Sequence, residues 1–61
     1  MARKIWTEEE VAALEKHIRG KVARKEPLTY GEDTLWGVLK NGKPLTVRMV
    51  EDIDHMAGIH D

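Results

Sequence analysis

Residues 27–46 read PLTYGEDTLWGVLKNGKPLT, a stretch that begins and ends with the same three residues, Pro-Leu-Thr. In both copies a threonine follows an apolar residue and precedes apolar residues at helical spacing. Such a threonine can accept hydrogen bonds from the free N–H groups of a first helical turn, and the apolar residue before it can pack over that turn. Trp6-Thr7 repeats the pattern near the start of the chain. The sequence therefore predicts helix starts at Thr7, Thr29 and Thr46.

The first expected helix covers about residues 7–24. Thr7 and Glu10 have the spacing of a capping box, in which each side chain bonds the other's backbone N–H. One apolar stripe at spacings of three and four follows, formed by Val11, Leu14, Ile18 and Val22. Gly20 leaves two alternatives, because the helix can end there or continue. We favour continuation, since Val22 extends the stripe.

The second and third expected helices cover about residues 29–41 and 46–57. Glu32 completes a second capping box, and Asn41-Gly42 followed by Pro44 predicts the end of the second helix. The third helix has an apolar stripe formed by Met49, Val50, Ile53, Met56 and Ala57, and we expect Arg48, Glu51, Asp52, Asp54 and His55 on its other faces. Gly58 is expected to end it.

These elements predict one all-α domain over residues 1–61, a compact three-helix bundle with a helix-turn-helix-like arrangement. A chain of this size buries only about 60% of its unfolded surface, so its core is small. The expected core consists of Trp6, Val11, Leu14, Ile18, Val22, Leu28, Leu35, Trp36, Val38, Leu39, Leu45, Met49, Val50, Ile53, Met56 and Ile59.

Composition narrows the class of protein. The 61 residues include no cysteine, which excludes disulfides and thiolate metal sites. No apolar stretch approaches the roughly 20 residues of a membrane span, and the opening residues run into three glutamates rather than forming a secretory signal. We therefore expect a cytoplasmic protein that does not enter a membrane.

The charge is unevenly distributed although the net charge is only −1. Residues 1–28 carry seven Lys/Arg and five Glu, whereas residues 29–61 carry three Lys/Arg and six Asp/Glu. The segment 16–25 contains five cations and no acid. It could contact phosphates, or it could simply complement the negative C-terminal end of a helix dipole, and we favour the second interpretation.

Residues that could support catalysis are scarce. The chain has no serine and no cysteine, and His55 and His60 are five residues apart, which misses the spacing that places two ligands on one helical face. Asp52 and Asp54 would lie about 200° apart on a helix and could not share a proton. We therefore expect no enzymatic activity, no cofactor and no metal site.

Residues 34–59 resemble the second half of a Cro/CI-type repressor helix-turn-helix domain. The likeness runs from Thr34 through Asn41-Gly42-Lys43 and Met49-Val50 to Gly58-Ile59, and residues 7–14 are similar to the family's supporting helix. It implies that the second helix is a DNA-recognition helix and that the third closes the core. The chain departs from the family in having residues 15–28 between the supporting and recognition helices and in placing Glu32 and Asp33 at the start of the latter. Residues 4–14 are similar to the opening of Myb-like repeats, although Trp36 lies too far along for their regular tryptophan spacing.

Two functional hypotheses follow. The first is a small, homodimeric, DNA-binding transcriptional regulator of phage or prokaryotic type, with its second helix in the major groove of double-stranded DNA. Its expected contact residues are Lys16, Arg19, Lys21, Arg24, Lys25, Tyr30, Thr34, Lys40, Asn41 and Lys43.

The second hypothesis is a protein-interaction module, such as an inhibitor, adaptor or antirepressor, that docks a helix face on a larger protein. Trp6 and Trp36 would be its anchors, unless they serve as core residues, which is the interpretation we favour.

Overall fold

The computed structural model describes residues 5–59, and helices account for most of this range. They are α1 (Glu8–Ala23), α2 (Tyr30–Lys40) and α3 (Val47–Ala57), and no strand occurs between residues 5 and 59. The all-α three-helix prediction is confirmed, and the observed helix ends lie within one residue of the expected ones. The expected ranges begin at the N-cap threonines, whereas the observed helices begin one residue later, because an N-cap residue does not itself have helical backbone angles.

The three threonines cap the helices as the sequence predicts. Thr7 and Thr29 each accept a hydrogen bond from the backbone N–H three residues later, and the glutamate at that position bonds back to the threonine N–H. Thr46 accepts from the backbone N–H of Met49 at 3.1 Å. Each cap satisfies N–H groups that have no partner inside the helix, which fixes where the helix begins.

α1 continues through Gly20 and ends at Ala23, which confirms the favoured alternative. The last turn closes through hydrogen bonds from the Arg24 N–H to the Gly20 carbonyl and from the Glu26 N–H to the Lys21 carbonyl. Lys25 adopts a φ of 59°, in the left-handed region that helix ends commonly use. The chain therefore turns sharply there, without a glycine, toward the start of α2.

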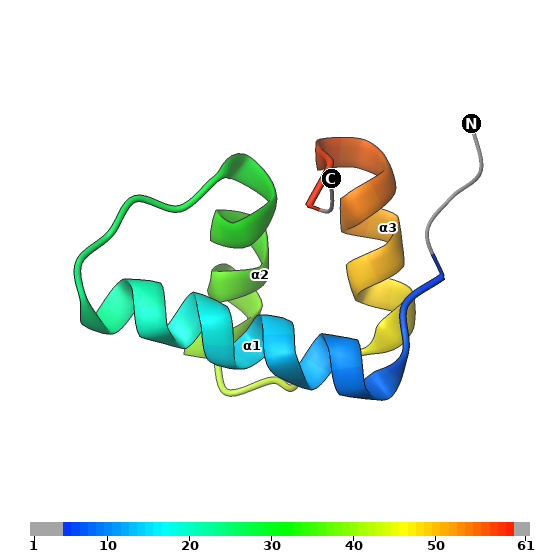
Figure 1. Cartoon of the computed structure of the whole chain (residues 1–61), viewed down its shortest axis with the longest axis horizontal. Helices are drawn as coiled ribbons and strands as arrows, with labels where there is room; N and C mark the ends of the chain where they lie inside the picture. Colours follow the sequence, from blue (N-terminus) through cyan, green and yellow to red (C-terminus); the bar gives the residue numbers. More distant parts are fainter. Residues whose placement is uncertain (1–4, 60–61) are drawn as a thin grey trace.

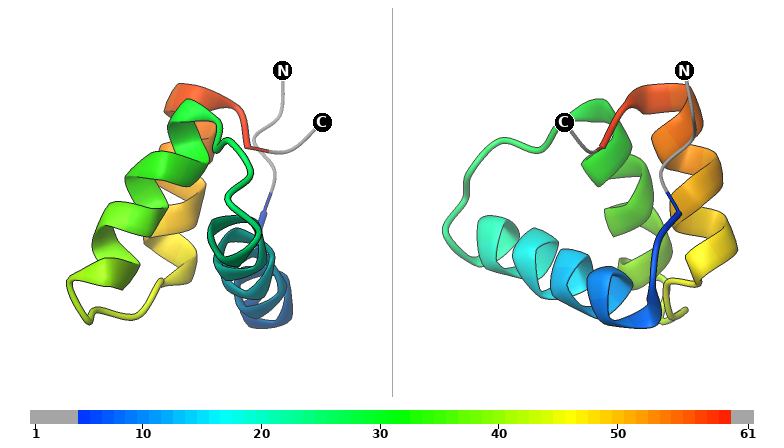
Figure 2. Two further views of the ribbon diagram at one scale, coloured as in Figure 1. Left: turned by 90° about the vertical axis from the view of Figure 1, so that its left-hand side faces the viewer. Right: turned by 45° about the vertical axis from the view of Figure 1, so that its right-hand side comes forward.

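α2 and α3 run side by side in opposite directions, and α1 crosses both of them (Figure 1). The left view of Figure 2 shows α1 nearly end-on beside this pair. Gly42, with a φ of 81°, ends the turn after α2, and the short connection that follows lets the chain reverse into α3. Because α1 packs on one side of the pair, parts of α2 and α3 remain uncovered.

The core lies where α1 meets the α2–α3 pair. Its fully enclosed side chains are Ile18, Leu35 and Val50, one from each helix. The other buried apolar residues are Trp6, Val11, Leu14 and Leu39, all of which were expected in the core. The remaining expected core residues are half-buried, with one exception.

That exception is Met56, whose exposed fraction is 79%, so its assignment to the core was wrong. The buried side of α3 is centred on Val50 and runs through Asp54 and Ala57. Met56 lies six residues after Val50, about 120° around the helix, and therefore points away from α1 and α2. The apolar stripe read from the sequence was centred too far toward Met49 and Met56.

Asp54 was expected on an outer face of α3, and this expectation was also wrong, because only 5% of the residue is exposed. Its carboxylate accepts a hydrogen bond from the Trp6 indole Nε1 at 3.0 Å and another from the Ile59 backbone N–H at 2.6 Å. Glu51 accepts from the Trp6 backbone N–H at 3.0 Å. These acids on α3 therefore hold the segment before α1 and the segment after α3 together.

Candidate nucleic-acid interface

The inner face of α2 is fixed to both other helices. Leu35 and Leu39 are buried in the core, and Gly31 is buried against the end of α3. A Cβ atom at Gly31 would lie 2.8 Å from Cγ1 of Ile59 and 3.3 Å from the Cβ of Ala57. The absence of a side chain therefore allows the close approach of the α2 start to the end of α3.

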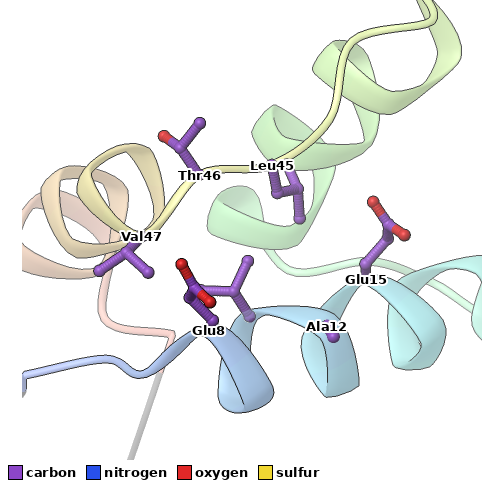
Figure 3. A pocket seen from close by; sticks show the side chains of 7 residues that line it. Glu8, Ala12, Glu15, Leu45, Thr46 and Val47 are labelled. Atoms are coloured by element: carbon purple, nitrogen blue, oxygen red, sulfur yellow. The ribbon is translucent and has the colours of Figure 1, made fainter.

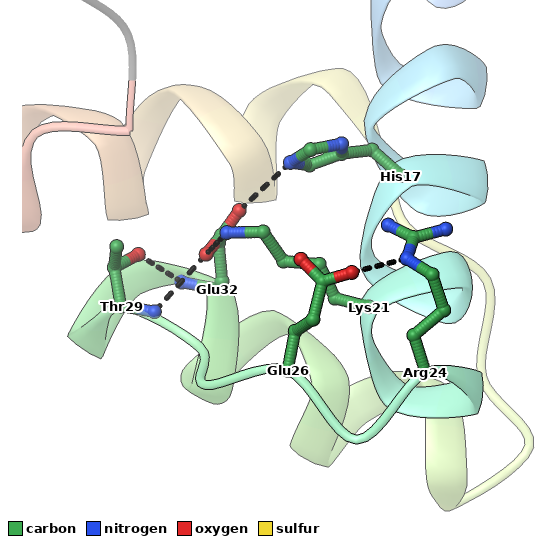
Figure 4. A network of polar contacts seen from close by, with 6 residues as sticks. All are labelled: His17, Lys21, Arg24, Glu26, Thr29 and Glu32. Atoms are coloured by element: carbon green, nitrogen blue, oxygen red, sulfur yellow. Dashed lines mark hydrogen bonds and ion pairs between the residues drawn. The ribbon is translucent and has the colours of Figure 1, made fainter.

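Glu32 attaches α2 to α1 through a buried carboxylate that is only 7% exposed (Figure 4). It accepts a hydrogen bond from Lys21 Nζ at 2.9 Å and one from the Thr29 backbone N–H at 3.0 Å. His17 Nε2 lies 3.3 Å from its other oxygen. Burial alone would raise the pKa of Glu32, but the bonds from Thr29 and Lys21 outweigh it, so the pKa is lowered.

The outer face of α2 carries the residues expected to approach bases. Tyr30 is 80% exposed, and Thr34, Lys40 and Asn41 are exposed as well. The Thr34 hydroxyl donates to the Tyr30 carbonyl at 2.9 Å, and Asn41 Nδ2 donates to the Gly37 carbonyl at 2.8 Å. Both side chains therefore lie close along the helix, and each keeps an oxygen that can still accept a hydrogen bond.

The five cations of residues 16–25 differ in exposure and in ion pairing. Lys16, Arg19 and Lys25 are exposed and take part in no ion pair within residues 5–59. Lys21 is half-buried and bound to Glu32. Arg24 is ion-paired with Glu26, and this hydrogen bond lowers the pKa of the Glu26 carboxyl. Two of the five expected phosphate contacts therefore already have an acidic partner in the molecule.

The other expected cations, Lys40 and Lys43, are exposed at the end of α2 and in the connection to α3. Like Lys16, they form no ion pair among the described residues. Figure 1 shows that the turn at residues 24–26 and the connection at 41–46 lie at different corners of the molecule. The structure thus divides the candidate contact residues into one group along α1 and its end and another at the end of α2.

Sequence reasoning identified Glu32 as a cap but not as the ion-pair partner of Lys21. No local pattern links residues 21 and 32, because their contact depends on how α1 crosses α2. The signal for Asp54 is a second stripe on α3, since Val47, Val50, Asp54 and Ala57 follow at spacings of three, four and three. This position lies on the buried stripe, where a carboxylate needs donors, and the Trp6 indole N–H is one.

Other kinds of site receive no support from residues 5–59. In this range no cluster of His, Asp or Glu side chains is suited to a metal ion. No helix in the same range has the length and apolar character needed to cross a bilayer. No protein-family model, curated protein or solved structure matches the chain. The residues and geometry of this molecule are therefore the basis on which its function is inferred.

Proposed function

We propose that the protein binds double-stranded DNA through the outer face of α2 and acts as a small transcriptional regulator of phage or prokaryotic type. The observation that supports the proposal most directly is the position of α2. Its inner face is held by α1 and α3, while Tyr30, Thr34, Lys40 and Asn41 face solvent. A rigid helix with a free polar face, backed by a crossing helix, has the general design of a major-groove reader.

The cations that lack an internal partner are the proposed phosphate contacts, and they form two groups. Lys40 and Lys43 lie at the end of α2, beside its outer face, whereas Lys16, Arg19 and Lys25 lie along α1 and at its end. Lys21 and Arg24 are left out of the proposed interface, because breaking their ion pairs would offset what a phosphate contact contributes. Asp33 is exposed in the first turn of α2 and would repel phosphate, so the Lys40 end of the helix is the end that we place nearest the backbone.

Titration of a fluorescent DNA duplex by anisotropy at two salt concentrations tests this proposal. With two contacts from the group at the end of α2 and up to five if both groups reach the duplex, we expect log K to fall against log salt with a slope of about −2 to −4.5. Removing Lys40 and Lys43 together should reduce that slope by about 2. The proposal is wrong if no binding occurs at low salt, or if binding does not respond to salt.

A second candidate function, docking on a larger protein, is favoured by the outer face of α3. Met56 is 79% exposed, and the half-buried Met49 and Ile53 line a shallow cleft of about 360 Å³ on the same helix. Methionine is enriched at adaptable interfaces. Trp6 loses support as an anchor, since it is buried and bound to Asp54, whereas Trp36 is half-buried. Retention of DNA binding in a Met56→Lys variant would separate this face from the DNA interface.

A further inference from the structure

A surface cleft of about 490 Å³ lies between α1 and the start of α3, away from the outer face of α2. Its apolar lining comes from Val11 and Ala12 on α1 and from Leu45 and Val47 on the facing segment. Leu45 and Val47 are only half-buried, so part of their apolar surface remains in contact with water. The volume is in the range of clefts that hold a few side chains or a small ligand.

Two carboxylates stand at the rim of this cleft. Figure 3 shows Glu8 and Glu15 reaching from α1 toward the segment that contains Leu45 and Val47, with Ala12 between them. They are seven residues apart on one side of α1, which corresponds to about 10 Å along the helix axis. Within residues 5–59 neither of them forms an ion pair.

The position of Glu15 needs a separate explanation from that of Glu8. Glu8 lies in the first turn of α1, where an acid stabilises the positive end of the helix dipole. Glu15 lies in the middle of the helix, is half-buried, and is not paired with Arg19 one turn later. A half-buried carboxylate at the edge of an apolar cleft is placed to pair with a cation supplied from outside.

We propose that this cleft binds a helical segment of another protein that carries apolar side chains between two basic residues. The apolar side chains would cover Ala12, Leu45 and Val47, and basic residues two turns apart would match the spacing of Glu8 and Glu15. This site contains none of the residues assigned to DNA contact. The proposal therefore stands or falls separately from DNA binding.

The test uses the full chain labelled with ¹⁵N and a synthetic alanine-based helical peptide that has two lysines two turns apart and two leucines between them. We expect saturable shifts at the amides of Ala12, Leu45, Thr46 and Val47, with a Kd of about 0.1–1 mM, as a small interface allows. A peptide with glutamines in place of the lysines should bind about tenfold more weakly, because two exposed ion pairs are lost.

A pair of double variants supplies the matched control. Glu8→Gln with Glu15→Gln should weaken binding of the lysine peptide about tenfold. Glu9→Gln with Asp33→Asn removes the same charge from exposed positions outside the cleft and should change Kd less than about twofold. The proposal is overturned if no saturable shift occurs, if the shifts map to other residues, or if both double variants weaken binding equally.

Discussion

The attachment of α1 to α2 through Glu32 yields a quantitative prediction. Glu32→Gln keeps the size of the side chain and an oxygen that can accept from Thr29, but it removes the charge that Lys21 binds. Hydrogen bonds to charged groups contribute about 1.5–3 kcal/mol to stability. Because a fifth of the Lys21 side chain is exposed, we expect Glu32→Gln to lower the free energy of unfolding by an amount in the lower half of this range, about 2 kcal/mol. For a domain of this size that corresponds to a decrease in Tm of about 8–16 °C.

Urea unfolding followed by far-ultraviolet circular dichroism measures the free energy of unfolding. The same substitution is made in a Lys21→Met background, so that the difference between the two losses gives the coupling energy of the pair. We expect a coupling of about 1–2 kcal/mol, because the pair is largely shielded from water. Equal losses in the two backgrounds, or a loss under about 0.5 kcal/mol in the native chain, would refute this reasoning.

The pH dependence of stability follows from the same carboxylate. Because the folded-state pKa of Glu32 is lowered from its ordinary value of 4.5, the native state binds this proton less readily than the unfolded chain. The contribution is fully present above pH 4.5 and is lost as the pH falls through the lowered folded value. Glu32→Gln should therefore flatten this acid part of the stability curve, and an unchanged profile would contradict the assignment.

Four further substitutions are expected to give distinct results in the same unfolding assay. Gly31→Ala should destabilise by about 1–3 kcal/mol, because the new Cβ would lie 2.8 Å from Cγ1 of Ile59. Gly37→Ala, with no atom within 4 Å of its new Cβ, should instead stabilise by about 0.5–1 kcal/mol. Gly58→Ala should cost about 1–2 kcal/mol, since its φ is 69° and its Cβ would be strained there. Met56→Lys should change the free energy of unfolding by less than about 0.5 kcal/mol, and a large loss would mean that this side chain is buried after all.

Much of the fold could be predicted from the sequence, because the residues that indicate helix ends and buried faces lie close together along the chain. The capping threonines and the spacing of Leu14 and Ile18 depend on residues within one or two turns, and they give the helix limits and most of the core. The continuation of α1 past Gly20 could be inferred from Val22 in the same way. Local signals of this kind do not depend on how the helices cross.

The errors came from contacts made between helices. The apolar spacing predicts a core position for Met56, but the side of α3 that faces the other helices is the one that carries Val50. The same spacing leaves Asp54 on an outer face, whereas Trp6 and Ile59, one at each end of the chain, supply the donors that satisfy its buried carboxylate. A single sequence does not state which of several neighbouring stripes faces the core.

In the candidate interface, too, features set by local sequence could be predicted, whereas features set by contacts between distant residues could not. Exposure of Tyr30 and Asn41 could be predicted from their place opposite the apolar face of α2. The ion pairs of Lys21 and Arg24 could not, because one depends on the crossing of α1 and α2 and the other on the left-handed turn at Lys25. Charge counts along a sequence therefore overestimate the cations available to a nucleic acid.

The proposed DNA-binding surface is the outer face of α2. Amide chemical shifts of the ¹⁵N-labelled chain, recorded while a DNA duplex is added at low salt, test this assignment residue by residue. Shifts that grow with DNA, concentrate at Tyr30, Thr34, Asn41 and Lys43 and weaken on adding salt are the expected result. A spectrum that does not respond to DNA, or that responds only at residues of α3, would contradict the assignment.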